Sequence, residues 1–263
     1  MSDFETLCDG CRAVLATANP HAKAQEARKV ATAWRAGGLE IGTPHAPDRP
    51  ARPQTPALMA PKDMPKRSFG GEKGRAALLH ALAHIELNAI DLAFDIIARF
   101  ASPDLPRAFY DDWIKVGDDE ARHFLMLSDR LADLNCAYGD LPAHDGLWQS
   151  AEDTNCDLLA RLAIVPLVHE ARGLDVTPQT VERLRRNGDD TSADLLQIIY
   201  NDEISHVKAG SDWFHWACEQ EGKSPEATFK ALVASYFKGL LKPPFNIEGR
   251  TQAGLPEIFY SEG

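Results

Sequence analysis

Two short motifs place a glutamate and a histidine three residues apart. They are Asp119-Glu120-x-x-His123 and Asp202-Glu203-x-x-His206. Residues three apart on an α-helix share one face, so a carboxylate oxygen and an imidazole nitrogen could reach one metal ion. A random order of the same residues would give roughly 0.5 Glu-x-x-His matches, and two copies each preceded by Asp would arise on the order of once in a thousand sequences. The repeated motif therefore predicts a metal site.

Two further glutamates fit the same pattern. In four-helix bundles that hold two metal ions, two helices each carry a Glu-x-x-His motif, and each of the other two helices contributes one glutamate. Glu86 is the only glutamate between positions 73 and 100, and Glu170 follows the apolar run 162–168, which favours it over Glu152. The intervals from Glu86 to Glu120 and from Glu170 to Glu203 are 34 and 33 residues. The sequence therefore predicts two helix pairs, each contributing Glu and then Glu-x-x-His.

The elements that must position these residues are long helices. Apolar residues recur with a helical period over about 73–100, 105–136, 150–173 and 190–221, and a shorter helix is expected from Val176 to about Gly188. Pro166 is expected to kink the third of the long helices. Because sustained two-residue alternation is almost absent, we predict an all-α fold with a four-helix bundle and additional helices at both ends.

The flanking regions differ in composition. Residues 1–42 predict a helical extension, and 43–70, with seven prolines between 43 and 66, predict an extended strap. The bundle is assigned to 71–222, and 223–263 to a helix from Ser224 to Leu241 with an irregular tail. We interpret the strap as a packing segment rather than a partner-binding one, while the tail could equally cover the site or act as a simple strap.

These residues carry a resemblance to a known group of proteins. Glu86, the two Asp-Glu-x-x-His motifs and Glu170 resemble the ferritin-like di-metal carboxylate superfamily over about residues 72–221. Within it, the chain most resembles a ferritin-like domain family of unknown function. The resemblance implies a pair of metal ions held by Glu86, Glu120, His123, Glu170, Glu203 and His206. It also implies that Asp119 and Asp202 hydrogen-bond ligand histidines. Tyr200 and His169 are nearby candidates for further roles, whereas His80 and His84 are interpreted as packed histidines.

The ligand set predicts the metal and the class of reaction. Carboxylate oxygens with two imidazoles suit iron, manganese or a mixed pair. We favour an oxidoreductase that activates dioxygen to oxidise or hydroxylate a small organic substrate, with electrons from a separate reductase. A ferroxidase or metal-handling protein and a non-catalytic metal-stabilised scaffold are the alternatives. The competing structural interpretation is a metal-free cluster of buried acids and histidines held by basic side chains such as Arg122, which would be costly.

Composition restricts partners and compartment. The formal charge of −11 disfavours nucleic acid, although a tRNA substrate is not ruled out by it, and disfavours an anionic membrane surface. No stretch has the apolar length of a membrane span, and the first residues lack a secretory signal. Five cysteines, an odd number spread through helix-like sequence, indicate free thiols in a reducing compartment, so we expect a cytoplasmic protein. A homodimer is left open.

Overall fold

Helices are the regular elements of this protein. The computed structural model describes residues 4–60, 63–64 and 71–261, and within those ranges it contains no strand, only two isolated bridges, Thr6 with Glu40 and Leu58 with Ala143. The all-α prediction is confirmed, while a ferritin-like arrangement stays a prediction. Across the same described ranges, every helix is too short or too polar to cross a bilayer. The chain forms two compact units, Met1–Trp148 and Gln149–Gly263.

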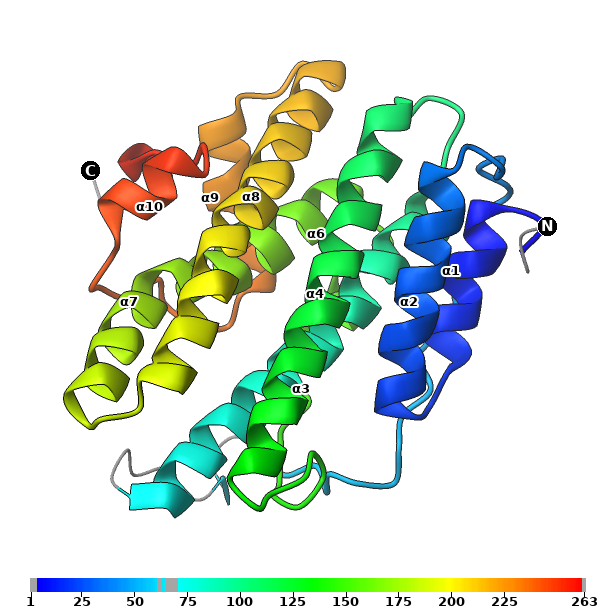
Figure 1. Cartoon of the computed structure of the whole chain (residues 1–263). Coiled ribbons are helices and arrows are strands. Elements are labelled where there is room, and N and C mark those ends of the chain that lie inside the picture. The colour runs from blue at the N-terminus through cyan, green and yellow to red at the C-terminus, as the bar shows by residue number, and fades with distance from the viewer. Residues whose placement is uncertain (1–3, 61–62, 65–70, 262–263) are drawn as a thin grey trace. The chain divides into compact units, whose positions relative to one another are not determined.

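The first unit is built around a pair of long helices. The pair is α3 (Gly71–Phe100) and α4 (Arg107–Asp133), which pack along each other (Figure 1). Two N-terminal helices, α1 (Leu7–Ala16) and α2 (Pro20–Arg35), cover this pair, and α2 lies mainly against α4. Asn19 caps α2 by accepting a hydrogen bond from the Ala22 backbone N–H, and Pro20 occupies the first turn, where its missing N–H costs nothing. The unit's core is therefore a layered stack of helices.

The proline-rich segment follows the surface of the first unit. Its described part, residues 43–60, contains no helix, as predicted, and the rest of the predicted strap up to Gly70 lies almost wholly outside the described residues. The Ala51 N–H donates to the Leu15 carbonyl, Arg99 donates to the Pro47 carbonyl, and Met59 pairs with Ala143. These contacts support the interpretation of residues 43–60 as a packing segment.

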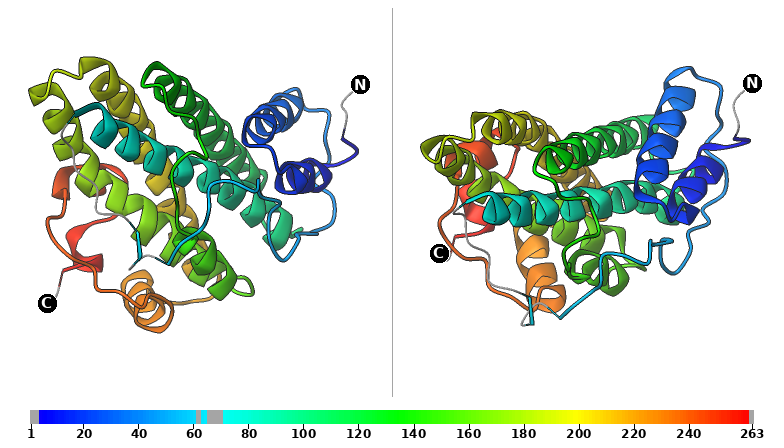
Figure 2. Two further views of the ribbon diagram at one scale, coloured as in Figure 1. Left: turned by 90° about the horizontal axis from the view of Figure 1, so that it is seen from below. Right: turned by 60° about the horizontal axis from the view of Figure 1, so that its bottom comes forward.

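The second unit contains one long helix, α8 (Asp190–Gln220), and three consecutive helical segments that pack against it. These segments are α6 (Leu158–Ile164), the π-helix η2 (Val165–Glu170) and α7 (Ala171–Arg186). Figure 2 shows the remaining elements of this unit, α9 (Pro225–Tyr236), α10 (Ile247–Gln252) and the short 3₁₀ turn η3 (Glu257–Phe259). A short helix, α5 (Gly146–Asp153), spans the boundary between the units.

Three of the predicted long helices agree with the structure to within a few residues, and three other predicted helices require correction. The predicted helix 150–173 is divided, because α5 ends at Asp153 and Asp157 then caps α6 through the Ala160 N–H. The expected break between 173 and 176 is absent, and α7 continues through Pro178. The helix predicted from Ser224 to Leu241 ends at Tyr236, and the tail expected to be irregular contains α10 and η3.

Candidate metal centre

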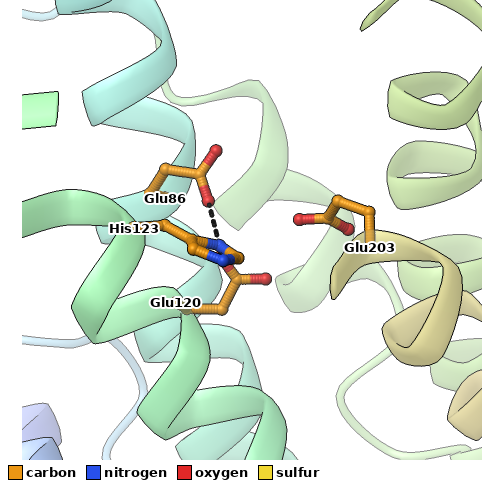
Figure 3. A group of neighbouring side chains, drawn as sticks. All are labelled: Glu86, Glu120, His123 and Glu203. Atoms are coloured by element: carbon orange, nitrogen blue, oxygen red, sulfur yellow. Dashed lines mark hydrogen bonds and ion pairs between the residues drawn. The ribbon is translucent and has the colours of Figure 1, made fainter. Parts of the chain in front are cut away.

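Three of the predicted ligands meet between α3 and α4. Glu86 comes from α3, and Glu120 and His123 come from one face of α4 (Figure 3). The His123 Nδ1 atom lies 3.4 Å from Oε2 of Glu86 and 3.4 Å from Oε2 of Glu120. One potential ligand atom from each of the three side chains lies within 4.8 Å of the others. The first unit therefore gathers two carboxylates and an imidazole around one point.

This group is buried almost completely. Glu86 and Glu120 are 4% and 1% exposed, and His123 is fully buried. Burial raises the pKa of Glu86 well above its usual range, the charge of Glu120 raises it further, and hydrogen bonding to His123 opposes both effects. Two carboxylates without a compensating cation would be expensive at this depth. Two oxygen donors and one nitrogen donor are a set that a divalent iron or manganese ion accepts, so the residues fit a metal.

The basic residues near this group make ion pairs with a neighbouring acid. Asp119 accepts from Lys115 at 2.8 Å and from Arg122 at 3.2 Å; the Lys115 side chain is exposed and that of Arg122 is partly exposed. Arg122 was the residue expected to neutralise the acids in a metal-free cluster. Arg122 pairs with Asp119, and the expected hydrogen bond that Asp119 would accept from a ligand histidine stays a prediction.

The second copy of the motif lies on α8. His206 is fully buried, and its Nδ1 atom is 3.6 Å from Oε2 of Glu203, whose side chain is 13% exposed. Glu203, also drawn in Figure 3, projects from α8 of the second unit. Asp202, immediately before it, is partly exposed. The Glu-x-x-His spacing thus brings the carboxylate and the imidazole to one helix face in both units.

The sixth predicted ligand, Glu170, ends the π-helix η2. Pro166 is near the start of η2 and cannot donate the backbone hydrogen bond of a regular α-helix, whereas the Ala171 N–H reaches back to the Pro166 carbonyl, the five-residue bond of a π-turn. Opposite Pro166 on α8 is Gly210, where an added Cβ would lie 2.3 Å from the Pro166 Cβ. The predicted kink is therefore a π-turn that carries Glu170 and packs against bare backbone of the helix carrying Glu203.

The two nearby candidates make specific hydrogen bonds inside the second unit. The Tyr200 hydroxyl accepts from the Asn246 amide at 2.9 Å. His169 Nε2 and the Ser150 hydroxyl are 2.8 Å apart, and burial lowers the pKa of His169 to about 4. His169 is therefore neutral at neutral pH. Asn246, the partner of Tyr200, is marked in the sequence only by its place in the polar tail.

The two histidines of α3, His80 and His84, belong to a packed cluster in the first unit. Tyr138 stacks on the rings of both His80 and His84. Its hydroxyl lies 2.8 Å from His84 Nδ1, while His84 Nε2 is 3.1 Å from the His144 carbonyl, which requires the proton on Nε2. The interpretation of His80 and His84 as packed histidines is confirmed, and Tyr138 is the partner that the sequence did not reveal.

Sequence comparisons relate this chain to a protein family and to a bacterial relative. An uncharacterized protein of Haemophilus influenzae is 42% identical over 212 residues, which cover 79% of this chain and 74% of the relative. No solved structure is detectably similar to the chain. The model of one family matches residues 16–261. The chain with the buried Glu86, Glu120 and His123 group thus belongs to the family described as "Protein of unknown function (DUF455)".

Proposed function

We propose that the protein is a di-metal carboxylate oxidoreductase whose centre is assembled from two equivalent sets of ligands. The first set is Glu86, Glu120 and His123, and the second is Glu170, Glu203 and His206. The observation that carries the proposal is the buried group of two carboxylates and one imidazole on α3 and α4. The second unit repeats the Glu-x-x-His pair on α8, and the other glutamate of its set, Glu170, ends η2.

The donor set favours iron or manganese. Four carboxylates would balance two divalent cations, and an oxygen-rich set is poorly suited to copper or structural zinc. When bound in the reduced state, such a pair would supply the electrons for activating dioxygen, and a separate reductase would restore it. The substrate in this proposal is a small organic molecule.

The chain's own residues would bind and orient the ions. Glu86 and Glu120 approach from different helices, so neither helix can shift without changing the ligand geometry. His123 is fully enclosed, which fixes its ring orientation and excludes bulk water from its nitrogen. His169, neutral and hydrogen-bonded to Ser150, would add no positive charge next to Glu170.

Metal content of the purified protein tests the proposal. We expect about two iron or manganese ions per chain by elemental mass spectrometry, a number that follows from the two ligand sets. The variants Glu86→Ala, Glu120→Ala and Glu203→Ala should each lower it. Glu182→Ala is the matched control, because Glu182 is an exposed residue of α7 paired with Arg186. Loss of both ions in Glu120→Ala and also in Glu203→Ala would support a shared centre.

Oxygen consumption separates the proposed reaction from simple metal binding. The reduced, loaded protein should consume dioxygen faster when a pool of small organic substrates is present. Folded wild-type protein that takes up neither Fe(II) nor Mn(II) would refute the proposal. Uptake of hundreds of iron ions per assembly would instead identify an iron-storage protein.

A further inference from the structure

Asn246 connects α8, which carries Glu203 and His206, to α7, which directly follows Glu170. Its backbone N–H donates to Asp175 Oδ1 at 2.9 Å, and its side-chain amide donates to the Leu174 carbonyl at 3.0 Å, both on α7. The same amide nitrogen donates to the Tyr200 hydroxyl on α8 at 2.9 Å. One side chain therefore joins α7 to α8 by direct hydrogen bonds.

The hydrogen bond to the Leu174 carbonyl also replaces one that the α7 helix lacks. Pro178 has no N–H, so the carbonyl four residues earlier, that of Leu174, lacks its normal helical donor. Asn246 supplies the donor from outside the helix. This explains why α7 continues through Pro178, and it means that removing the amide leaves a carbonyl to be satisfied by water or by distortion of α7.

A buried ion pair holds Asn246 in place. Arg250, four residues later, donates from Nε and Nη2 to the two carboxylate oxygens of Asp175 at 2.8 and 2.7 Å. Both side chains are almost fully buried, and the guanidinium lies over the rings of Phe245 and Tyr260. The segment that carries Asn246 is therefore anchored independently of the amide itself.

The contacts of Asn246 lie close to the proposed ligands along both helices. Leu174 follows Glu170 by four residues, and Tyr200 precedes Glu203 by three, so each contact is about one helical turn from a ligand. Gly249 faces the same point, because an added Cβ would lie 2.8 Å from the Tyr200 hydroxyl. The C-terminal segment thus fits closely around the Asn246 and Tyr200 contact.

We propose that Asn246 is a positioning residue that fixes the spacing of Glu170 and Glu203 for metal binding. The inference rests on the proposed function for its metal ligands, but the bridge between α7 and α8 can be tested without metal. The proposal predicts that the Asn246 amide and the Tyr200 hydroxyl act through their shared hydrogen bond, and that this bond positions only the second set of ligands.

Titration of the metal-free protein with Mn²⁺ alone, following the free ion by electron paramagnetic resonance, tests the effect on binding. Asn246→Ser keeps a side-chain oxygen that can accept from the Gly249 N–H, and Tyr200→Phe removes only the hydroxyl. Each variant should weaken the binding of one of two Mn²⁺ ions by about tenfold and affect the binding of the other less. The double variant should bind like Asn246→Ser, because both substitutions remove the same bond.

Asn187→Ser is the matched control, since Asn187 also donates its amide to an α7 carbonyl, that of Arg183, at the opposite end of the helix. If Asn246→Ser lowers thermal stability but leaves both Mn²⁺ affinities at the wild-type value, the positioning role is overturned.

Hydrogen exchange of the metal-free chain separates this inference from the proposed function. Asn246→Ser should speed exchange in peptides covering 165–175 and 196–206 relative to Asn187→Ser. Unchanged exchange overturns the inference whether or not the wild type binds metal. Wild-type protein that binds no Mn²⁺ refutes the proposed function, and faster exchange in that case still establishes the bridge between the helices.

Discussion

Gly117 on α4 lies so close to Phe94 on α3 that a Cβ on Gly117 would stand 2.5 Å from the Phe94 Cε2 atom. Phe94 is fully buried, so its ring has little room to move. Gly117 precedes Glu120 by three residues, and the missing side chain lets the two helices approach closely beside Glu86 and Glu120.

Gly117→Ala should therefore destabilise the protein by about 1–3 kcal/mol, even though alanine favours a helix more than glycine does. The measurement is the free energy of unfolding in urea. Gly173→Ala is the control, because Gly173 lies in α7 with no atom within 4 Å of an added Cβ, and it should stabilise by up to about 1 kcal/mol. Equal stability of the two variants would contradict the close contact.

Glu120→Gln should have opposite effects with and without metal. In the presence of a chelator, loss of one buried carboxylate beside Glu86 should raise the free energy of unfolding by about 1–2 kcal/mol. With Mn²⁺ added, the wild type should gain stability through binding while the variant gains less. Urea unfolding under both conditions measures the difference. A variant that is less stable than the wild type in chelator would show that the two acids do not destabilise the metal-free protein.

Pro166→Ala should convert η2 towards a regular α-helix, because alanine restores the N–H that the π-turn lacks. A change of one residue in the helical register rotates Glu170 by about 100°. We expect metal content to fall while helicity measured by circular dichroism is retained. Pro225→Ala, at the first turn of α9, is the control with unchanged metal. Full metal occupancy in Pro166→Ala would show that the π-turn is not needed to place Glu170.

The five cysteines are free, as the sequence predicted, and they should differ in reactivity. Cys156 is exposed and should react first with an alkylating reagent at pH 8. Cys8 is buried, and burial raises its pKa to about 11, so it should react far more slowly. Mass spectrometry of the labelled protein gives the order, and faster labelling of Cys8 than of Cys156 would contradict it.

The same thiol makes stability depend on pH. A cysteine in an unfolded chain ionises near pH 8.5, whereas folded Cys8 keeps its proton up to about pH 11. Between these values the unfolded chain releases a proton that the folded chain retains. The contribution of Cys8 to the free energy of unfolding is therefore complete below about pH 8.5 and is lost as the pH rises through 11. Cys8→Ala should flatten the alkaline part of the stability profile.

Local patterns in the sequence were sufficient for the three longest helices and for the pairings of glutamate with histidine in the candidate site. The helical period and the Glu-x-x-His spacing identified the pairing of Glu120 with His123 and of Glu203 with His206, because residues three apart on a helix are neighbours. Glu86 was identified by its being the only glutamate in its helix, and the structure places it beside His123. The joining of all six residues in one centre stays a prediction.

Other features depended on contacts that the sequence does not show. Pro178 reads as a helix break, and only the amide of Asn246, 68 residues later, explains why α7 continues. The π-turn at Pro166 likewise depends on Gly210 of α8, since a side chain there would exclude the proline ring. Tyr138 stacks on His80 and His84 from a loop whose position has no local signal. In each case a distant residue decides the local conformation.

The contacts of residues 43–60 imply that the length of this segment matters more than its side chains. Three of its attachments use the main chain: the Ala51 N–H, the Pro47 carbonyl and the pairing of residues 57–59 with Ala143. Arg49 and Arg52, which pair with Asp145, are the exceptions. Exposed positions between the attachments should therefore tolerate many substitutions, whereas inserting or deleting a single residue would move every later attachment out of register.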